Sequence, residues 1–275
     1  MDVTVARRSE GRRAPEAGAG GSGRLDFVTA DVTDAKSVQS AVAGADAAIN
    51  LVGILFEKGR QTFTRVHEQG ARNVAEAAAA AGVGRLVQMS ALGASAQSPS
   101  AYARSKAAGE RAVREAFPQA TIMRPSIVFG PDDDFFNKFA GMARFSPALP
   151  LIGGGRTRFQ PVYVGDVAHA FVVALDADSA AGKTYELAGP RTYSFRTLLQ
   201  LMLDTMGTRR VLVPVPFFVA ELQGMVLGQL PTPPLTRDQV ELLKTDNVAV
   251  GHEPGLTELG IIPTAVEEIL PSYLG

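Results

Sequence analysis

The stretch that decides the fold spans residues 86–114, LVQMSALGASAQSPSAYARSKAAGERAVR. A short apolar run, a small and polar loop and an Ala/Glu/Arg-rich segment predict a strand, a loop and a helix. Tyr102 and Lys106 are four residues apart, so both lie on one face of that helix. An ammonium beside a phenol favours the phenolate and lowers the tyrosine pKa, which suits proton transfer. Any surface helix can carry this spacing, but Ser90 in the preceding loop strengthens the case for a catalytic pair.

The composition excludes several classes of protein. The 275 residues include 27 basic and 28 acidic side chains, a formal net charge of −1, and no cysteine. The balanced charge does not indicate a nucleic-acid partner, and without thiols the chain forms no disulfide or thiolate metal site. His67, His169 and His252 lack ligand spacing and are interpreted as separate structural or surface residues. No membrane span or secretory signal is found, so we expect a cytoplasmic protein.

Strand and helix patterns alternate along the first 117 residues. The run at 46–52 is continuously apolar, as expected for a strand covered on both faces. Strands are predicted at residues 2–8, 25–32 and 46–52, and helices at 33–44 and 66–82. The alternation predicts an α/β fold, a doubly wound parallel sheet with helices on both sides.

A glycine pattern near the N-terminus does not fit its usual role. Gly18, Gly20 and Gly23 match G-x-G-x-x-G, but a loop precedes them and a strand follows. A dinucleotide fingerprint instead follows a strand and opens a helix. In the strand order 3-2-1-4-5-6 the first strand is central. We therefore expect this chain to lack about 25 to 30 residues of the usual unit, its first strand and glycine turn, ahead of Val3.

The second half is predicted to form a smaller lobe. We expect a nucleotide-binding domain at 1–130 and a smaller α/β lobe at 131–275, with 156–175 returning to the main domain. Residues 215–230 are apolar apart from three polar side chains. This segment either packs as a helix within the smaller lobe or lies against a partner or a membrane surface.

Several helix starts carry capping residues. A side-chain oxygen at an N-cap accepts a hydrogen bond from a free backbone N–H of the first turn. The predicted N-caps are Thr33 or Asp34, Asp166, Ser194 and Thr236.

Short motifs in a fixed order resemble a known family. ADVTD, INLVG, ARNVAEAA, YARSKAAGE, RPSIVFGP, PVYVGDVAHA and YELAGP occur in the order typical of extended short-chain dehydrogenases and epimerases. Within that branch, TRDQVELLKTDNV followed by PGLTELGI is similar to the NAD(P)H-binding accessory subunit family of respiratory complex I. The first set implies a Rossmann-like fold and a nicotinamide dinucleotide, and the second implies respiratory-complex subunits as partners.

The resemblance also implies a set of nucleotide-binding residues. Arg7 and Arg8 stand where an NAD enzyme usually places an acidic residue on the ribose 2′-hydroxyl. They would bind a 2′-phosphate and favour NADP(H), or form a solvated basic turn. The other residues with an implied nucleotide contact are Asp31 and Val32 at the adenine, Leu51, Val52, Gly53 and Asn73 along the cofactor, Tyr102 and Lys106 at the nicotinamide ribose, and Arg124, Pro125, Ser126 and Ile127 at the nicotinamide end.

One departure from the family pattern bears on activity. Ser90 lies twelve residues before Tyr102, whereas extended enzymes place the catalytic hydroxyl one or two residues later, where this chain has Ala91 and Leu92. We therefore expect an accessory or assembly protein with a structural nucleotide, peripheral at the inner face of the cytoplasmic membrane. The alternative is an active NAD(P)-dependent oxidoreductase or epimerase using Ser90, Tyr102 and Lys106.

Overall fold

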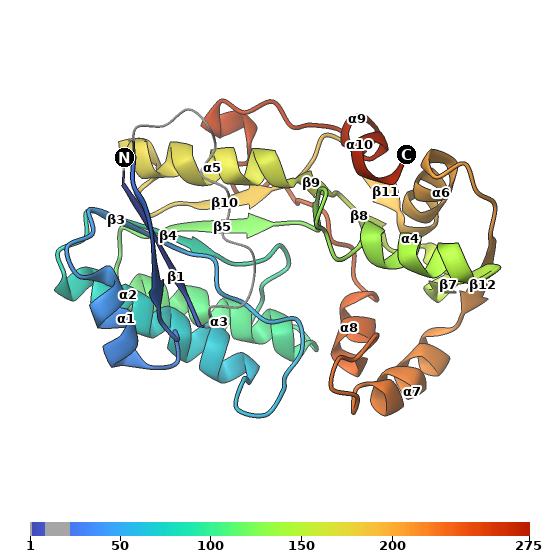
Figure 1. Ribbon diagram of the computed structural model, residues 1–275, viewed down its shortest axis with the longest axis horizontal. Coiled ribbons are helices and arrows are strands. Elements are labelled where there is room, and N and C mark those ends of the chain that lie inside the picture. The colour runs from blue at the N-terminus through green and yellow to red at the C-terminus, as the bar shows by residue number, and fades with distance from the viewer. Residues whose placement is uncertain (1, 9–22) are drawn as a thin grey trace.

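The computed structural model describes residues 2–8 and 23–275, and its centre is a parallel four-stranded sheet (Figure 1). The strand order is β10-β5-β4-β3. These strands are β3 (Ala47–Asn50), β4 (Arg85–Met89), β5 (Thr121–Pro125) and β10 (Thr184–Leu187). Helix α5 (Val164–Asp176) covers one face, and α1 (Ala35–Val42), α2 (Gly70–Ala80) and α3 (Ala101–Ala116) cover the other. The predicted doubly wound parallel sheet is therefore confirmed.

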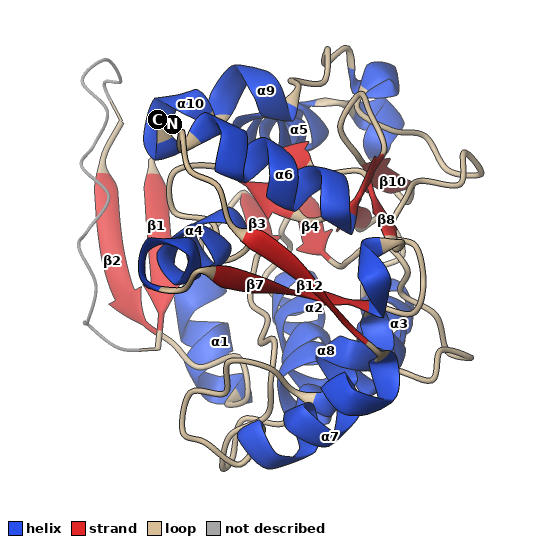
Figure 2. Cartoon of the chain, turned by 90° about the vertical axis from the view of Figure 1, so that its right-hand side faces the viewer, coloured by secondary structure: helices blue, strands red, loops and turns tan. Residues whose placement is uncertain are grey.

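The first two strands form a separate parallel pair, β1 (Val3–Arg7) and β2 (Leu25–Thr29), with Val3 opposite Leu25. Figure 2 shows this pair standing apart from the main sheet. No ladder joins the two sheets within the described residues. The strand order expected from the sequence places a first strand between β1 and β3. Side chains on the facing strands are partly open to solvent, with Val3 39% and Ile49 40% exposed.

The helices pack on the main sheet through small residues. Buried alanines of α2, including Ala71, Ala75 and Ala78, lie in one cluster with Leu86 of β4 and Ile122 of β5. Small side chains allow the helix backbone to approach the sheet closely, and burying the larger strand residues stabilises the layer. The alanine content of α2, which favours a helix by intrinsic propensity, therefore also serves close packing.

The smaller lobe has its own aromatic core. Buried Phe129, Phe136, Phe159 and Phe195 lie in one apolar cluster, with Phe136 and Phe129 packed edge to face. The lobe contains helices α4 (Phe136–Phe145), α6 (Phe195–Thr205), α7 (Phe217–Leu227), α8 (Arg237–Leu242), α9 (Val266–Ile269) and α10 (Pro271–Leu274), and the parallel strands β7 (Ala148–Ile152) and β12 (Val211–Val215). There are also two short strand pairs: β6 (Val128–Phe129) runs parallel to β9 (Val162–Tyr163), and β8 (Arg158–Phe159) runs antiparallel to β11 (Tyr193–Ser194).

Most predicted caps are confirmed. Ser194 and Thr236 cap α6 and α8, and Asp34 caps α1. The prediction for Asp166 was wrong, because α5 begins two residues earlier. Its buried carboxylate instead accepts hydrogen bonds from the backbone N–H and the hydroxyl of Thr264, at 2.7 and 3.0 Å. Asp166 therefore binds a residue 98 positions away in sequence, and not a backbone N–H in the first turn of its own helix.

Helix α7 exposes an apolar stripe. Phe218, Leu222, Met225 and Val226 are each more than half exposed and follow helical spacing, while Ala220 is buried on the opposite side. Across the described parts of the chain, no helix is long and apolar enough to cross a membrane. The sequence-predicted segment 215–230 is therefore a helix of the smaller lobe with one uncovered apolar side.

Gly109 brings α3 close to the backbone of His67 in the preceding helical turn, which gives a stability prediction. A Cβ at this position would lie 2.1 Å from the carbonyl oxygen of His67. Gly109→Ala should therefore lower the free energy of unfolding by roughly 1–3 kcal/mol, measured by urea denaturation. Gly141→Ala in α4, where no atom lies within 4 Å of such a Cβ, should raise it by about 0.4–1 kcal/mol. Equal effects of the two changes would contradict the packing shown here.

Candidate functional site

The Tyr102–Lys106 pair lies on the first turns of α3, as predicted. Ser100 caps this helix by accepting a hydrogen bond from the N–H of Ala103 at 3.2 Å. The Nζ atom of Lys106 lies over the Tyr102 ring, 5.8 Å from its centroid, so it faces the ring. Within the described residues, neither Lys106 Nζ nor the Tyr102 hydroxyl has a hydrogen-bond partner.

Burial controls the charge of this pair. It lowers the pKa of Lys106 to about 8, although the charge of Glu110 acts in the opposite direction. It raises the pKa of Tyr102 to about 12. The sequence-based expectation that Lys106 lowers the tyrosine pKa was therefore wrong for the chain without a ligand, because removal of the phenolate from water outweighs the nearby cation.

His67 connects the loop after β3 with helix α3. The sequence analysis did not include it among the candidate site residues. It lies in η1 (Thr64–Gln69), a π-helical turn before α2. Its Nε2 accepts a hydrogen bond from the N–H of Ile54 at 3.0 Å, and its Nδ1 lies 2.8 Å from Ser105 Oγ. Ser105 donates its own proton to the Tyr102 carbonyl, so Nδ1 is the donor. Burial, and then the charge of Lys106, lower the pKa of His67 to about 3 and keep it neutral.

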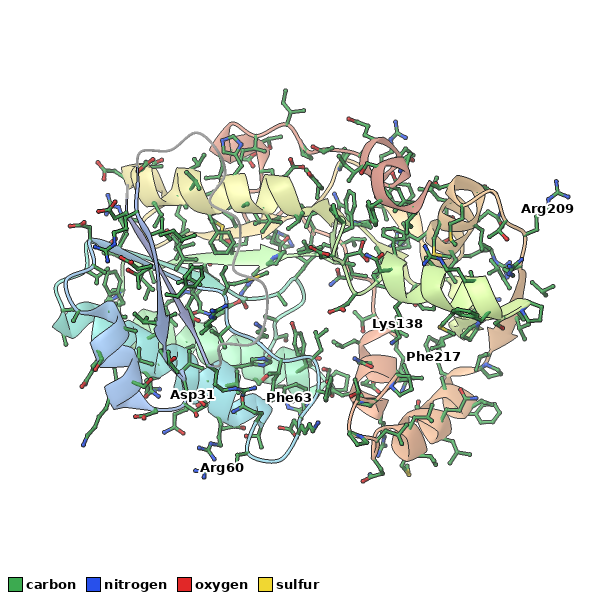
Figure 3. All side chains as sticks on the ribbon, viewed as in Figure 1. Asp31, Arg60, Phe63, Lys138, Arg209 and Phe217 are labelled. Atoms are coloured by element: carbon green, nitrogen blue, oxygen red, sulfur yellow. The ribbon has the colours of Figure 1, made fainter. Side chains whose placement is uncertain are left out.

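The loop after β3 comes close to the pair. A Cβ at Gly53 would lie 3.1 Å from Lys106 Nζ, so a side chain at this position would crowd the ammonium. Val52 and Leu51 are 40% and 59% exposed beside it. Phe63, which is labelled in Figure 3, lies ahead of η1. Its ring packs edge-on against Tyr102, with ring centroids 5.8 Å apart. The structure therefore brings the predicted Leu51–Gly53 segment together with Lys106 and Tyr102.

Ser90 is held by a buried ion pair. Its hydroxyl donates to Oε1 of Glu110 at 2.6 Å. Arg124 donates to both oxygens of the same carboxylate at 2.8 and 2.7 Å, and Arg114 lies 3.4 Å from Oε2. The Glu110 side chain is only 3% exposed, and its hydrogen bond raises the pKa of Arg124. The candidate hydroxyl is therefore directed at a carboxylate and not at Tyr102.

The predicted adenine end carries positive charge around Asp31. Its Oδ1 accepts hydrogen bonds from the N–H and the hydroxyl of Thr33, at 2.9 and 2.8 Å. Burial acts to raise the pKa of Asp31, but Thr33 and the charges of Arg8 and Arg65 hold it below its usual value. Arg65, on η1, is a second cation here that the sequence pattern did not indicate.

Two other predicted residues lie at the same end. The guanidinium of Arg7 is 4.8 Å from the centroid of the Phe27 ring. Asn73, on α2, donates its side-chain N–H to the backbone oxygen of Val32 at 2.8 Å. Asn73 therefore fixes the end of the β2 loop, and Arg7 lies on the neighbouring strand.

The residues predicted at the nicotinamide end point in different directions. The Arg124 guanidinium is held by the buried carboxylate described above. Pro125 is a backbone acceptor for the N–H of Leu92 at 2.9 Å. Ser126 donates to Oδ1 of Asn247 at 2.7 Å, and Ile127 packs against the core of the smaller lobe. Arg124 and Ser126 carry the polar side chains of this set, and Asn247 of the smaller lobe contacts Ser126.

Comparison with known proteins places the chain in a family. The model of the NAD dependent epimerase/dehydratase family matches residues 2–188. The chain belongs to this family. It is 38% identical over 250 residues to "NADH dehydrogenase [ubiquinone] 1 alpha subcomplex subunit 9, mitochondrial" of Mus musculus, which covers 90% of this chain and 66% of that relative. The chain thus spans just under two thirds of that relative's length.

Two solved structures share the fold. One is the triphenylmethane reductase of Citrobacter sp. complexed with NADP(H), with a TM-score of 0.69, 22% identity and coverage of 91% of this chain and 84% of that chain. The other is the dTDP-glucose 4,6-dehydratase of Streptomyces venezuelae with NAD bound, with a TM-score of 0.67, 22% identity and coverage of 91% and 79%. Because the two hold different dinucleotides, the fold does not decide between NAD and NADP.

The buried lysine gives a prediction for stability against pH. The Lys106 pKa is about 8 in the folded chain, below its ordinary value of 10.5, so the unfolded chain binds more protons between these pH values. Stability should therefore rise as the pH increases through that window. Lys106→Met removes this dependence and should stabilise the ligand-free chain by about 3 kcal/mol at pH 7, with a smaller gain at pH 9.5.

Urea unfolding of both variants at the two pH values measures this difference. Lys36→Met, at an exposed position of α1, is the control and should give the same difference at both pH values. A gain for Lys106→Met that does not change with pH would contradict a buried, depressed lysine.

Proposed function

We propose that this chain binds a nicotinamide dinucleotide, NADP(H) in preference to NAD(H), as a structural ligand. We further propose that it serves a respiratory NADH dehydrogenase complex as an accessory subunit in assembly or stability. The relative from mouse, named as a subunit of such a complex, supports the second part. A ligand that binds only the native state stabilises the fold by mass action, without any turnover.

The geometry around Lys106 fits a ribose. Lys106 is 7% exposed, yet its ammonium and the Tyr102 hydroxyl have no partner among the described residues. Among the described residues no fully buried side-chain nitrogen or oxygen lacks a partner, so these two donors still reach solvent and are available to an acceptor from outside the chain. Gly53 keeps the adjacent space open. We infer that ribose hydroxyls are held there by Lys106 and Tyr102.

The hydrogen bond that the Ser90 hydroxyl donates is the main support for a structural ligand. Extended reductases need a hydroxyl that orients the substrate beside the tyrosine. In this chain Ser90 donates to Glu110 at 2.6 Å, and Arg124 occupies the same carboxylate. Freeing Ser90 would remove its hydrogen bond to a buried carboxylate, which costs about 1.5–3 kcal/mol. The tyrosine, with its pKa raised to about 12, is also a poor base.

The cations near β1 support NADP(H). Arg8 and Arg65 are close enough to Asp31 to lower its pKa, and Arg7 lies on the end of β1. Arginine guanidinium groups are well suited to a phosphate because they donate paired hydrogen bonds. We infer that Arg7 and Arg8, with help from Arg65, bind the 2′-phosphate.

The surface of α7 supports a peripheral position. Its apolar stripe of Phe218, Leu222, Met225 and Val226 is uncovered. An exposed apolar helix face of this kind is suited to lie in a membrane interface or against an apolar partner surface. We propose a cytoplasmic protein that contacts the inner face of the cytoplasmic membrane through residues 215–230, next to respiratory-complex subunits.

The alternative function is an active NAD(P)-dependent oxidoreductase or epimerase. The observation that favours it is the retained Tyr102–Lys106 pair on one face of α3. A bound dinucleotide would supply the hydride acceptor or donor, and Tyr102 would transfer the proton. Lys106 would have to move from the ring face toward the hydroxyl to lower the tyrosine pKa.

Nucleotide binding tests the main proposal. NADPH and NADH are titrated by fluorescence and thermal shift into this chain and into one extended at the N-terminus by an apolar strand and a glycine-rich turn. We expect NADPH to bind more tightly than NADH, and more tightly to the extended chain, because a glycine turn supplies phosphate-binding N–H groups. Arg7→Ala/Arg8→Ala should raise the NADPH dissociation constant by about tenfold and leave that of NADH unchanged.

The matched control is Arg60→Ala/Arg209→Ala, which removes two exposed arginines labelled in Figure 3. It should not change either affinity. Bound NADPH should stay reduced for hours in the presence of quinone and carbonyl compounds. Oxidation that depends on Tyr102 would favour the active enzyme, and no binding to either chain would rule out both nucleotide functions.

Vesicle binding tests the peripheral position. Leu222→Asp/Met225→Asp places two charges on the exposed stripe and should lower co-sedimentation with phosphatidylglycerol-containing vesicles by at least about tenfold. Val172→Asp/Val250→Asp, at two other exposed apolar residues, should have no effect. If the wild-type chain does not bind vesicles, the stripe belongs to a protein contact.

A further inference from the structure

One segment of the smaller lobe caps the helix that carries Tyr102 and Lys106. Asp238, on α8, accepts hydrogen bonds at the start of α3 from the hydroxyl of Ser100 at 2.8 Å. It also accepts from the N–H groups of Ala101 and Tyr102, at 2.7 and 3.1 Å. The first N–H groups of a helix have no partner inside the helix, and a carboxylate there is favoured by the helix dipole. The Tyr102 backbone is therefore held from a position 136 residues away in sequence.

The same segment also reaches the other side of the site. Asn247 accepts the Ser126 hydroxyl at 2.7 Å and lies 3.3 Å from the Leu92 carbonyl oxygen through its side-chain N–H. Its backbone N–H donates to Arg158 at 2.8 Å, and its carbonyl accepts from Gln160 at 3.0 Å. Residues 236–250, which we name the clamp segment, thus contact both Tyr102, predicted at the nicotinamide ribose, and Ser126, predicted at the nicotinamide end.

The clamp segment is fixed to the smaller lobe. Thr236 and Gln239 form a reciprocal capping box at the start of α8. Lys244 binds Glu221 of α7 at 2.8 Å and Glu241 of α8 at 2.7 Å. These contacts make the segment move with its lobe, so any change in how the lobe docks is transmitted to Asp238 and Asn247.

We propose that the clamp segment positions the nucleotide site, with Asp238 as its main positioning residue, and couples docking of the smaller lobe to nucleotide binding. The proposal rests on the nucleotide-binding function above. Asp238 holds the turn that carries Tyr102, and Asn247 holds Ser126, so nucleotide binding and clamp docking stabilise one another. Such coupling is reciprocal: a nucleotide in the site also protects the clamp segment.

The experiment measures NADPH affinity and amide hydrogen exchange in whichever chain, as given or N-terminally extended, binds more tightly. Asp238→Asn keeps the shape but presents an N–H₂ group or a neutral oxygen to three donors. We expect it to raise the NADPH dissociation constant by about tenfold at a temperature where the chain is fully folded. Asp132→Asn, at an exposed carboxylate of the same lobe, should leave it unchanged.

Hydrogen exchange separates positioning from general stability. Asp238→Asn should speed exchange at residues 101–106, and Asn247→Ala should speed exchange around Ser126. In the wild type, NADPH should slow exchange of residues 236–250. Wild-type affinity in Asp238→Asn, or no NADPH effect on the clamp segment, would overturn the proposal. If the wild type binds no nucleotide, the proposed function fails. The role of the clamp segment is then judged only by hydrogen exchange at residues 101–106 in Asp238→Asn. Faster exchange there supports a positioning role, and unchanged exchange overturns it.

Discussion

The buried carboxylate of Glu110 is the interaction on which the rest of the site depends. It lies on α3, and it joins Ser90 after β4 to Arg124 on β5. A buried charge is tolerated only when it is paired and hydrogen-bonded, so α3 can take only a narrow range of positions over the sheet. Tyr102 and Lys106 lie on the same helix, and their placement against the Gly53 loop follows from that constraint.

The same constraint supports the proposal of a structural ligand. A catalytic hydroxyl must be free to donate to a substrate, whereas here it donates to a carboxylate that also holds an arginine. The Lys106 ammonium faces an aromatic ring and the Tyr102 hydroxyl has no partner among the described residues. In the function that we propose, the two donors hold a ligand and the site does not transfer a proton.

Local patterns predicted much of the fold. Helical spacing of Tyr102 and Lys106 and the caps Ser194 and Thr236 were found where the sequence indicated them, because these features involve residues a few positions apart. The separation of the β1–β2 pair from the main sheet agrees with the strand order 3-2-1-4-5-6 expected from the sequence. Asp166 was misassigned because its partner, Thr264, lies in a distant segment. His67 was missed because no spacing relates it to Tyr102.

The sequence by itself determined the parallel α/β fold, the helix with its Tyr–Lys pair and the family, because these depend on periodicity and on short motifs. Only the tertiary structure decided the charges and the partners of the site. Burial, which reverses the expected shift of the Tyr102 pKa, is a property of the packed chain. The partners of Ser90, His67, Asp238 and Asn247 are set by long-range packing, because each is brought to its contact by elements that are not neighbours in the sequence.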